Sequence, residues 1–512
     1  MNTHAPSPYA GEGLYDWLRH REPRWAKLAI MHRLDRETSG VIVFSKSERG
    51  NRSLAKQFEE RAVKKKYVFL TAGTKKERAF TVKSCLARAG GKYISRPVHA
   101  GGIAAETRFR LLSEKSESKR LGESLWEAQP VTGRTHQIRV QAAENGIPVL
   151  GDVLYSGRDA ARVFLHSAEM TIRHPATMEE MTFRAEPNFG GDPTWELRKA
   201  LIDFQKNNAW RMIHGAADRN PGWYVDRLGD FLFSQRTSEL ANRQRSELLA
   251  LQQRCKCKGI YHKNLVRDLR RKAPSDATAM LISGDAAPDH FVVLENGLQF
   301  ELSFQEGYSV GLFLDQRDNR RRVLDGYIGL DFPLYSSGPT EVLNTFAYAC
   351  AFSACAAKAG ARVTSLDLSR KYLAWGKRNF EINQLDPKQH DFIFGDVFDW
   401  LPRLTKKDRR FDVILLDPPT FSQSKEFGAF RAEKGYGKLV ELAMPLLKPD
   451  GVIFCSSNAA RWKPEDFLSQ IKGAIEKSKR RIVQQEYFPQ PPDFPISRDE
   501  PAYLKTAWLR VR

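Results

Sequence analysis

Hydrophobic and polar residues are spaced differently in the two ends of this 512-residue chain. From residue 1 to about residue 189, the pattern is that of short alternating strands with few long helices. Such a pattern is typical of a mixed α+β domain. We predict an amphipathic helix over residues 49–61 and strands over residues 41–44, 67–71, 80–82 and 124–129.

From about residue 296 onward, strand-like runs alternate with helical stretches, as expected for a doubly wound parallel sheet. Ligands bind such sheets outside the carboxyl ends of the strands. Four polar side chains stand there: Asn344, Asp367, Asp396 and Asp417. We predict the strands over residues 342–344, 363–367, 391–394, 413–416 and 452–455, followed by a final pair over residues 482–485 and 507–511.

The length of the chain predicts about three domains. We place an α+β domain at residues 1–190, a small α+β connecting domain at residues 191–295 and an α/β Rossmann-like domain at residues 296–512. The polar stretch of residues 190–194 marks the first junction. The fold class is therefore multidomain.

The charge of the chain predicts a polyanionic partner. There are 81 Lys and Arg against 61 Asp and Glu, a net charge of +20. Such an excess favours a nucleic acid, because each neutralised phosphate releases condensed counterions. The basic runs at residues 64–66, 270–272 and 320–322 are individually typical of solvated faces, and together they predict a diffuse RNA-binding surface.

Cysteine and apolar patterns narrow the class of protein further. Six cysteines in a chain of this length do not form a disulfide framework. The pair Cys255 and Cys257 lacks a second pair at zinc spacing, so we predict no metal site. No apolar segment reaches membrane-spanning length, and the N-terminus lacks a signal pattern. We expect a soluble cytoplasmic protein without a membrane partner, whose oligomeric state the sequence does not indicate.

Two polar segments of the first domain carry candidate chemistry. Residues 32–40 read HRLDRETSG and residues 131–139 read VTGRTHQIR. A solvated loop with a salt-bridged Asp35 is the plain interpretation of the first segment alone. In this order and at this separation, the two segments resemble the RluA family of pseudouridine synthases. The resemblance covers nearly all of residues 1–190.

This resemblance implies the isomerisation of uridine to pseudouridine, which needs no metal or cofactor. It makes Asp35 the carboxylate of the covalent step and pairs it with Arg134, which keeps it ionised. Tyr67 would stack on the uracil, which must leave the RNA stack to reach the site. A half-buried strand tyrosine is the plain alternative. Family members usually begin with an extra strand, so we expect that Met1 lies inside the true domain and that a strand is missing.

The last domain carries a different set of motifs. Acidic and amide residues after successive strands suit a nucleoside, which favours S-adenosylmethionine and leaves a dinucleotide open. The segments GLFLDQR (residues 311–317), LNTFAY (343–348), SLD (365–367) and LDPPTF (416–421) resemble the class I 23S rRNA methyltransferases of the RlmI and RlmK type. The resemblance spans about residues 205–512.

Roles for individual residues follow from this second resemblance. Asp367 would hold the ribose and Asp396 the adenine, while Asp417 with Phe421 would face the target base. For each acidic residue, a helix N-cap after a strand is the plain alternative. The complete set of predicted cofactor-binding residues is Asp315, Asn344, Phe346, Asp367, Asp396 and Asp417.

Two departures from the methyltransferase pattern affect the chemistry. The family's Gly-rich turn is replaced by Ala349-Cys350-Ala351, whose side chains would crowd the cofactor and weaken its binding without abolishing it. Cytosine-type members place a cysteine one position later than Cys455, and a shift of one residue in a strand turns the side chain to the opposite face. We interpret Cys455 as a buried structural thiol. Guanine N7 and cytosine C5 both stay open, with cytosine disfavoured.

The sequence thus predicts a bifunctional RNA-modification enzyme, a pseudouridine synthase followed by an S-adenosylmethionine-dependent RNA base methyltransferase. Ribosomal RNA is the favoured substrate, and transfer RNA stays open. An alternative is an RNA-binding ribosome-assembly factor in which one or both sites are inactive, as the altered turn and the missing strand suggest. A DNA methyltransferase or a nicotinamide enzyme has no support from the first domain.

Overall fold

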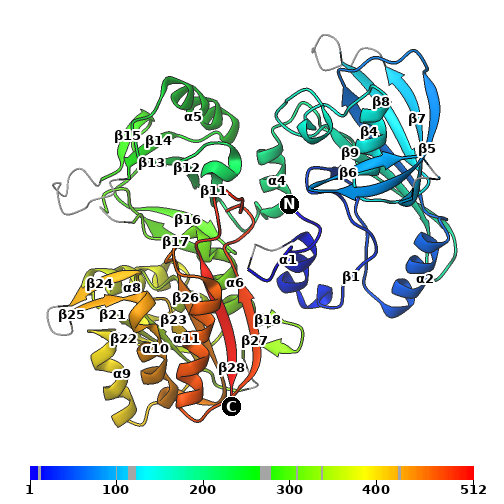
Figure 1. Cartoon of the computed structure of the whole chain (residues 1–512). Helices are drawn as coiled ribbons and strands as arrows, with labels where there is room; N and C mark the ends of the chain where they lie inside the picture. The colour runs from blue at the N-terminus through cyan, green and yellow to red at the C-terminus, as the bar shows by residue number, and fades with distance from the viewer. Residues whose placement is uncertain are drawn as a thin grey trace. The chain divides into compact units, whose positions relative to one another are not determined.

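The computed structural model of the chain describes residues 1–9, 13–97, 99, 101–113, 123–265, 278–306, 309–335, 338–424 and 428–512. The chain forms two compact units. The first comprises Met1–Ala5 and Gly13–Pro193, and the second comprises Pro6–Glu12 and Thr194–Arg512. Figure 1 shows the elements of each unit along the chain.

An eight-stranded sheet forms the centre of the first unit, in the order β10-β9-β4-β8-β7-β5-β6, with the short β2 paired to β9. Phe69, Phe109 and Trp126 from three of its central strands are buried together with Ile138 of α3. The elements of this unit are α1 (Leu14–Arg21), β1 (Ala29–Ile30), β2 (Ser39–Gly40), β3 (Phe44–Ser45), α2 (Glu48–Glu59), β4 (Lys64–Thr71), β5 (Ala79–Ala89), β6 (Lys92–Arg96), β7 (Ile103–Ser113), β8 (Ser124–Pro130), α3 (Gln137–Glu144), β9 (Leu165–Arg173) and β10 (Glu180–Arg184).

Most of the elements predicted for this unit are confirmed. The predicted strands over residues 67–71, 80–82 and 124–129 lie inside β4, β5 and β8, and the predicted helix corresponds to α2. The strand predicted over residues 41–44 is wrong, because β2 ends at Gly40 and β3 begins only at Phe44. Between them the backbone leaves the strand pattern, and the N–H of Val43 donates to the His32 ring at 3.0 Å.

The second unit begins with a small domain built on a five-stranded sheet, in the order β11-β12-β13-β14-β15. One face of this sheet buries Trp210, Trp223 and Leu232 against Leu248 and Leu251 of α5. The elements are α4 (Pro193–Leu201), β11 (Ala209–His214), β12 (Trp223–Leu228), β13 (Phe231–Arg236), α5 (Asn242–Cys255), β14 (Gly259–Asn264) and β15 (Met280–Gly284), followed by the hairpin β16 (Phe291–Glu295) and β17 (Leu298–Leu302).

A seven-stranded sheet in the order β22-β21-β20-β23-β26-β28-β27 forms the rest of this unit. The first five strands in this order are parallel, and β28 runs antiparallel to both of its neighbours, β26 and β27, so the predicted doubly wound sheet is confirmed. Its strands are β20 (Glu341–Thr345), β21 (Arg362–Asp367), β22 (Asp391–Phe394), β23 (Phe411–Leu416), β26 (Leu447–Ser457), β27 (Ile482–Phe488) and β28 (Lys505–Val511).

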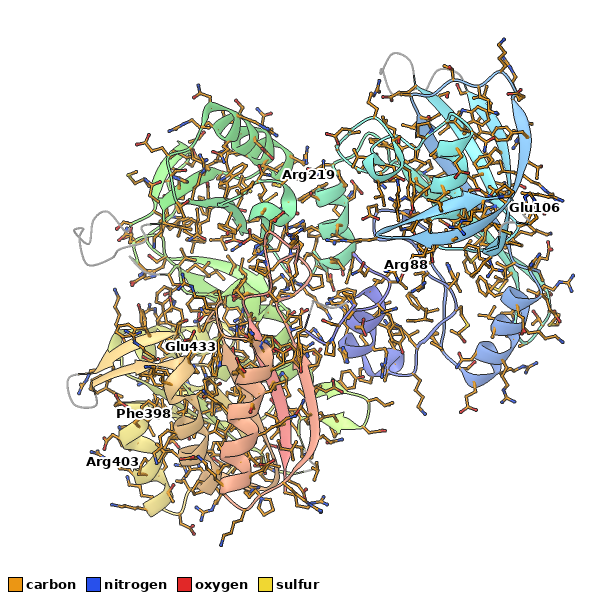
Figure 2. The ribbon with its side chains drawn as sticks, viewed as in Figure 1. Arg88, Glu106, Arg219, Phe398, Arg403 and Glu433 are labelled. Atoms are coloured by element: carbon orange, nitrogen blue, oxygen red, sulfur yellow. The ribbon has the colours of Figure 1, made fainter. Side chains whose placement is uncertain are left out.

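Helices cover both faces of the seven-stranded sheet. Val323, Ala354 and Leu373 from the first three helices pack on one face, and residues of the last three pack on the other. In Figure 2, the labelled Phe398 and Arg403 mark α9. These helices are α6 (Arg317–Asp325), α7 (Ala351–Lys358), α8 (Arg370–Ile382), α9 (Val397–Lys406), α10 (Ala432–Ala443) and α11 (Pro464–Lys477). A small hairpin, β24 (Phe421–Ser424) with β25 (Gly428–Arg431), follows β23.

One basic run predicted to be solvated is buried instead. Arg320, Arg321 and Arg322 in α6 are 2%, 7% and 2% exposed. The guanidinium of Arg320 donates two hydrogen bonds to the carboxylate of Glu295, at 2.6 and 2.8 Å. The buried carboxylate of Glu295 neutralises Arg320, and because all three side chains are buried, the run is not part of an RNA-binding surface. The run at residues 270–272 lies outside the described residues.

Two further features of the described residues are the character of the helices and the state of the cysteines. Within the described part of the chain, no helix has both the length and the apolar character needed to cross a membrane. All six cysteines are buried free thiols.

Candidate active sites

Asp35 lies in the turn that joins β1 to β2, and its side chain is 23% exposed. Gly40 ends the same segment with a φ of 111° and pairs with Ser167 of β9. A Cβ at residue 40 would lie 2.2 Å from the carbonyl oxygen of Ser167. Glycine is required there because β2 runs directly against β9. This pairing brings Asp35 to the sheet.

Arg139 in α3 is the cation that faces Asp35. Its Nη1 lies 3.7 Å from Oδ2 of Asp35 and 3.6 Å from Oε2 of Glu37. Its Nε and Nη2 donate to the two carboxylate oxygens of Asp152, at 2.6 and 2.8 Å. Because this fork-to-fork pair fixes the plane of the guanidinium, the remaining nitrogen is held toward Asp35.

The predicted pairing of Asp35 with Arg134 is therefore corrected. The exposed Arg134 donates from Nε to the carbonyl oxygen of Ala104 at 3.2 Å. Both arginines belong to the segment VTGRTHQIR, but Arg134 lies in the turn before α3 and Arg139 on the buried side of the helix. The spacing within the motif did not reveal this difference, because the helix begins at Gln137, between the two residues.

Gln137 explains why this segment folds into a fixed turn. Its Oε1 accepts from the Thr132 hydroxyl at 2.6 Å and from the backbone N–H of Arg134 at 3.0 Å. Its Nε2 donates to the carbonyl oxygen of Glu106 at 2.9 Å and to the Thr107 hydroxyl at 2.8 Å. One buried amide thus ties the turn to β7, so the start of α3 is rigid.

Burial shapes the acid–base properties of this site. It raises the pKa of Asp35, against the opposing charges of His136 and Arg139. It also raises the pKa of Tyr67 to about 12, so the phenol keeps its proton at neutral pH. Tyr67 in β4 is 9% exposed and pairs with Ser167, the same residue that pairs with Gly40. Because β2 and β4 both pair with β9, a single strand separates Tyr67 from the end of the Asp35 segment.

His136 is a residue of this site that the sequence reasoning did not single out. It has a φ of 55°, and its Nδ1 lies 2.7 Å from the hydroxyl of Tyr155. Burial lowers its pKa, against the raising effect of Asp35. The sequence feature that could have identified His136 as a site residue is its place in the segment VTGRTHQIR.

In the second unit, the carboxylate of Asp367 closes the carboxyl end of β21. It accepts hydrogen bonds from the backbone N–H groups of Tyr348 and Ser369, both at 2.8 Å. Burial raises the pKa of Asp367, and these two amides oppose the shift. The bond to Tyr348 ties the turn after β20 to the end of the neighbouring strand.

The turn after β20 contains the residues that replace the expected glycines. Phe346, Tyr348 and Cys350 all have positive φ angles, of 54°, 49° and 58°, which non-glycine residues rarely adopt. A Cβ at Gly376 of α8 would lie 2.3 Å from the Sγ of Cys350. The thiol of Cys350 is therefore packed into space that a glycine of α8 leaves open.

The side chains of Asn344 and Asp396 both form hydrogen bonds within the protein. Asn344 is 2% exposed, and its amide donates to the Ser353 hydroxyl of α7 at 2.9 Å, so it positions the helix that follows the turn. Asp396 is the N-cap of α9, and its Oδ1 accepts from the backbone N–H of Phe398 at 2.8 Å. The N-cap alternative is thus realised for Asp396, with its second carboxylate oxygen still able to accept.

Asp417 follows β23 and lies in a network of neutral donors. The Gln316 amide nitrogen is 3.3 Å from both carboxylate oxygens of Asp417 and donates to the Ser456 hydroxyl at 2.7 Å. The Gln316 amide oxygen accepts from Asn319 at 2.7 Å, which fixes the orientation of the amide. Burial raises the pKa of Asp417 to about 6, and the nearby charge of Asp315 acts in the same direction. The structure thus brings Asp315 and Asp417 together.

Phe421 and Cys455 differ in their exposure to solvent. Phe421 is 46% exposed at the start of β24, so its ring is open to a ligand. Cys455 is 0% exposed, and burial raises the pKa of its thiol, so the interpretation as a buried structural thiol is confirmed. Ser456, its neighbour in β26, instead meets Gln316 beside Asp417. Alternation along the strand therefore presents a hydroxyl, not a thiol, to the site.

Residues 223–510 match the family of S-adenosylmethionine-dependent methyltransferases, and this stretch is more than half of the chain. The chain belongs to this methyltransferase family. Residues 10–144 match the RNA pseudouridylate synthase family, so the methyltransferase is preceded by a pseudouridine synthase domain.

Similar proteins agree with this assignment of the methyltransferase. Ribosomal RNA large subunit methyltransferase I of Yersinia pestis is 33% identical over 309 residues, which is 59% of this chain and 75% of that protein. The protein of the same name from Erwinia tasmaniensis is 33% identical over 62% of this chain and 78% of its own length. The crystal structure of a proposed methyltransferase complexed with SAH is 29% identical, with a TM-score of 0.53, over 62% of this chain and 79% of that one.

The residues at the strand ends fit S-adenosylmethionine, the cofactor of this family. Asp367 and Asp396 offer carboxylate oxygens to hydroxyl and amino donors. Leu368 after β21 and Phe394 at the end of β22 are 51% and 45% exposed, so two apolar side chains stand open beside these acids. An apolar surface edged by carboxylates suits the faces and the donors of an adenosine.

Proposed function

We propose that this protein modifies ribosomal RNA twice, converting a uridine to pseudouridine at Asp35 and methylating a base at Asp417. One observation carries the proposal: each unit holds a half-buried carboxylate with its own set of oriented partners, Arg139 in the first and Gln316 in the second. The names of the similar methyltransferases support ribosomal RNA as the substrate. For the domains we keep the proposed boundaries near residues 190 and 295.

In the first reaction, the bond between C1′ and N1 of uridine breaks and a bond between C1′ and C5 forms. C5 then loses its proton and N1 takes one up, so the product is an isomer of the substrate. Asp35 supplies the carboxylate of the covalent step, and Arg139 favours its ionised form against the effect of burial. Tyr67 packs on the uracil after it leaves the RNA stack. With a pKa of about 12, its hydroxyl serves as a hydrogen-bond donor at neutral pH.

In the second reaction, S-adenosylmethionine supplies the methyl group. Asp367 would hold the ribose hydroxyls and Asp396 the adenine amino group, and Asp315 and Phe346 would complete the binding site. Asp417 accepts hydrogen bonds from the target base and Phe421 stacks on it. Gln316 orients Asp417 because its amide is held by Asn319 and Ser456.

The methylated atom is best explained as a ring nitrogen with a lone pair. Methylation of cytosine at C5 requires a thiolate that attacks C6, whereas methylation of guanine at N7 requires only positioning. Cys455 is fully buried, and Ser456 takes the place beside Asp417. A serine hydroxyl is a much weaker nucleophile than a thiolate at neutral pH. We therefore propose guanine N7.

Modification mapping tests this function. Ribosomal and transfer RNA from cells lacking the protein would be digested and mapped by mass spectrometry, after complementation with the wild type, Asp35→Ala or Asp417→Ala. We expect one pseudouridine that depends on Asp35 and one methylguanine that depends on Asp417, both in ribosomal RNA. Dependent sites in transfer RNA would overturn the substrate. No dependent site in any strain would favour an assembly factor with inactive sites.

A further inference from the structure

The three lysines of the basic run in β4 have different surroundings. The Nζ of Lys64 lies 2.8 Å from a carboxylate oxygen of Glu180, and the Nζ of Lys66 lies 3.5 Å from a carboxylate oxygen of Glu169. Side chains alternate along a strand, so Lys65 points away from these two acids. Its ammonium makes no hydrogen bond or ion pair with another described residue.

On its own face of the strand, the ammonium of Lys65 lies against the turn that precedes α3. A Cβ added at Gly133 would lie 3.1 Å from its Nζ, so the absence of a side chain at Gly133 leaves room for the ammonium. The next residue of the turn is Arg134, which is exposed and donates from Nε to the carbonyl oxygen of Ala104 at 3.2 Å. Within the described part of the chain, no carboxylate pairs with this guanidinium, and its two Nη groups have no hydrogen-bond acceptor. Two cations from separate segments therefore lie close together without an acid.

Holding these two cations together costs free energy when no anion is bound. Lys65 is half-buried, and burial lowers the pKa of its ammonium, with the like charge of Arg134 acting in the same direction. The nearby His32 brings no negative charge. Its Nε2 accepts from the N–H of Val43 at 3.0 Å, and burial and the charge of Lys65 lower its pKa to about 4, so the ring is neutral at neutral pH. An anion bound here would relieve the repulsion between the two cations.

The segments that carry these cations also carry residues of the pseudouridine synthase site. In β4, Lys65 stands two residues before Tyr67, which is proposed to pack on the uracil. In the other segment, Arg134 stands five residues before Arg139, the cation that faces Asp35. An anion between Lys65 and Arg134 would therefore lie next to the bound uridine. The anion that an RNA strand offers there is a backbone phosphate, which lysine and arginine commonly contact.

We propose that Lys65 and Arg134 together bind a backbone phosphate of the RNA, next to the uridine that is isomerised. This inference rests on the proposed function, because it takes RNA as the substrate of the first unit. It gives Arg134 a role in substrate binding in place of the predicted pairing with Asp35. It also makes Lys65, which has no acid partner, the phosphate contact within the basic run of β4.

The test uses the full-length protein and large-subunit ribosomal RNA transcribed in vitro with tritium at C5 of uridine. For Lys65→Met and Arg134→Gln, single-turnover tritium release at varied enzyme concentration gives the half-saturating concentration and the maximal rate. RNA dissociation constants over a range of salt concentrations report the number of phosphate contacts. Two matched controls, Lys56→Met and Arg52→Gln, remove the same charges from exposed residues that form ion pairs within α2.

We expect each site variant to raise the half-saturating concentration and the RNA dissociation constant about tenfold, the effect of a lost hydrogen bond to a charged group. The slope of log Kd against log salt concentration should fall by about one. The maximal rate should change by less than about threefold, and the controls should stay within about twofold in every quantity. Arg134→Lys keeps the charge and should retain most of the affinity. Lys65→Met should melt at or above the wild-type temperature, because it removes a half-buried charge that lacks an acid partner.

Equal effects in site and control variants would overturn the inference. A lower melting temperature of Lys65→Met with an unchanged salt slope would also overturn it, because Lys65 would then have a structural role only. If the wild type binds RNA but releases no tritium, the proposed function fails, while the dissociation constants and salt slopes still test the phosphate site. If the wild type does not bind RNA, both fail.

Discussion

Asp35 and Asp417 are two half-buried carboxylates in different electrostatic settings. Asp35 faces the guanidinium of Arg139 at 3.7 Å. Among the described residues, the donors at hydrogen-bond distance from Asp417 are neutral, namely the Gln316 amide at 3.3 Å and the Ser456 hydroxyl beside it. Burial raises the pKa of both. The difference fits their proposed tasks, because a carboxylate that forms a covalent bond must stay ionised, whereas one that orients a base needs only fixed lone pairs.

The partners of these carboxylates are themselves held in place. Asp152 is 1% exposed and fixes Arg139 through two hydrogen bonds. Asn319 is 2% exposed and fixes the Gln316 amide. In both sites a fully buried residue sets the orientation of the group that touches the carboxylate, so positioning extends one residue beyond the reacting groups.

The largest expected effect distinguishes Asp35 from Glu37, the two carboxylates that face Arg139. Asp35→Asn should lower the rate of pseudouridine formation by at least about a thousandfold, because the covalent nucleophile is lost. Glu37→Gln is the matched control, since Glu37 lies at 3.6 Å from the same guanidinium nitrogen, and should change the rate by less than about tenfold. Tritium release from C5-labelled RNA measures both. Similar losses in the two variants would contradict the assignment of the nucleophile.

The second-largest expected effect distinguishes Arg139 from Arg134. Arg139→Lys should lower pseudouridine formation about a hundredfold, because an ammonium cannot bind both oxygens of Asp152 and also face Asp35. Arg134→Lys should change kcat by less than about threefold. A single-turnover assay at saturating enzyme separates these outcomes from weaker RNA binding. The reverse order would restore the original pairing of Asp35 with Arg134.

A third prediction concerns stability and pH at Asp417. Its pKa is raised to about 6 from 3.8, so the folded state binds this proton more tightly than the unfolded state. The ionised carboxylate therefore destabilises the folded protein above about pH 6, and this penalty vanishes below about pH 4. The stability advantage of Asp417→Asn should grow between these pH values to about 2–3 kcal/mol.

This pH dependence can be measured by thermal unfolding of the full-length protein, in the transition that S-adenosylmethionine shifts upward. Asp412→Asn is a control outside the active site, with a carboxylate that accepts from Lys448 at 2.8 Å. A difference between wild type and Asp417→Asn that does not change with pH would show that the half-buried carboxylate carries no such penalty.

The smallest expected effect concerns the two neighbours in β26. Cys455→Ala should leave the rate of methyl transfer within about twofold of wild type, because the thiol does not face the site. Ser456→Ala should lower the rate by about three- to tenfold through the lost hydrogen bond to Gln316. Kinetics with ribosomal RNA would show the contrast. A large loss in Cys455→Ala together with a trapped covalent RNA complex in the wild type would favour cytosine C5.

Local sequence was sufficient where the physical signal is local. The strands of the seven-stranded sheet were predictable because buried parallel strands are short apolar runs between helical stretches. The face of Cys455 was predictable because side chains alternate along a strand. The strand predicted over residues 41–44 failed because the backbone bonding to β9 stops after the N–H of Val41 donates to Ser167, and the N–H of Val43 donates to the His32 ring instead. The side chains of Val41 and Val43 pack beside Met170 and Ile172.

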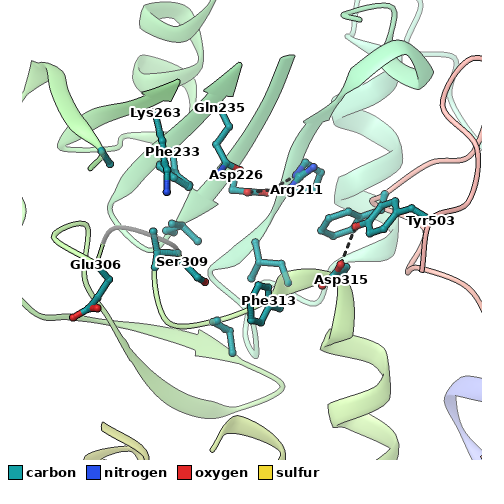
Figure 3. Close-up of a pocket in the computed structure, with 16 residues that line it drawn as sticks. Arg211, Asp226, Phe233, Gln235, Lys263, Glu306, Ser309, Phe313, Asp315 and Tyr503 are labelled. Carbon is teal, nitrogen blue, oxygen red and sulfur yellow. Dashed lines mark hydrogen bonds and ion pairs between the residues drawn. The ribbon is translucent and has the colours of Figure 1, made fainter. Parts of the chain in front are cut away.

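By itself, then, the sequence determined the two families, the order of the domains, the strand ends that carry Asp367, Asp396 and Asp417, and the segments that hold Asp35 and Tyr67. Only the tertiary structure decided that Arg139 faces Asp35, that Gln316 holds Asp417 from 101 positions away in the chain, and that Arg320 to Arg322 are buried. It also formed the cavity of about 160 Å³ between the small sheet and the segment that leads into α6 (Figure 3). The physical reason is that side-chain direction and burial depend on which distant elements pack together, and no local pattern of residues records that packing.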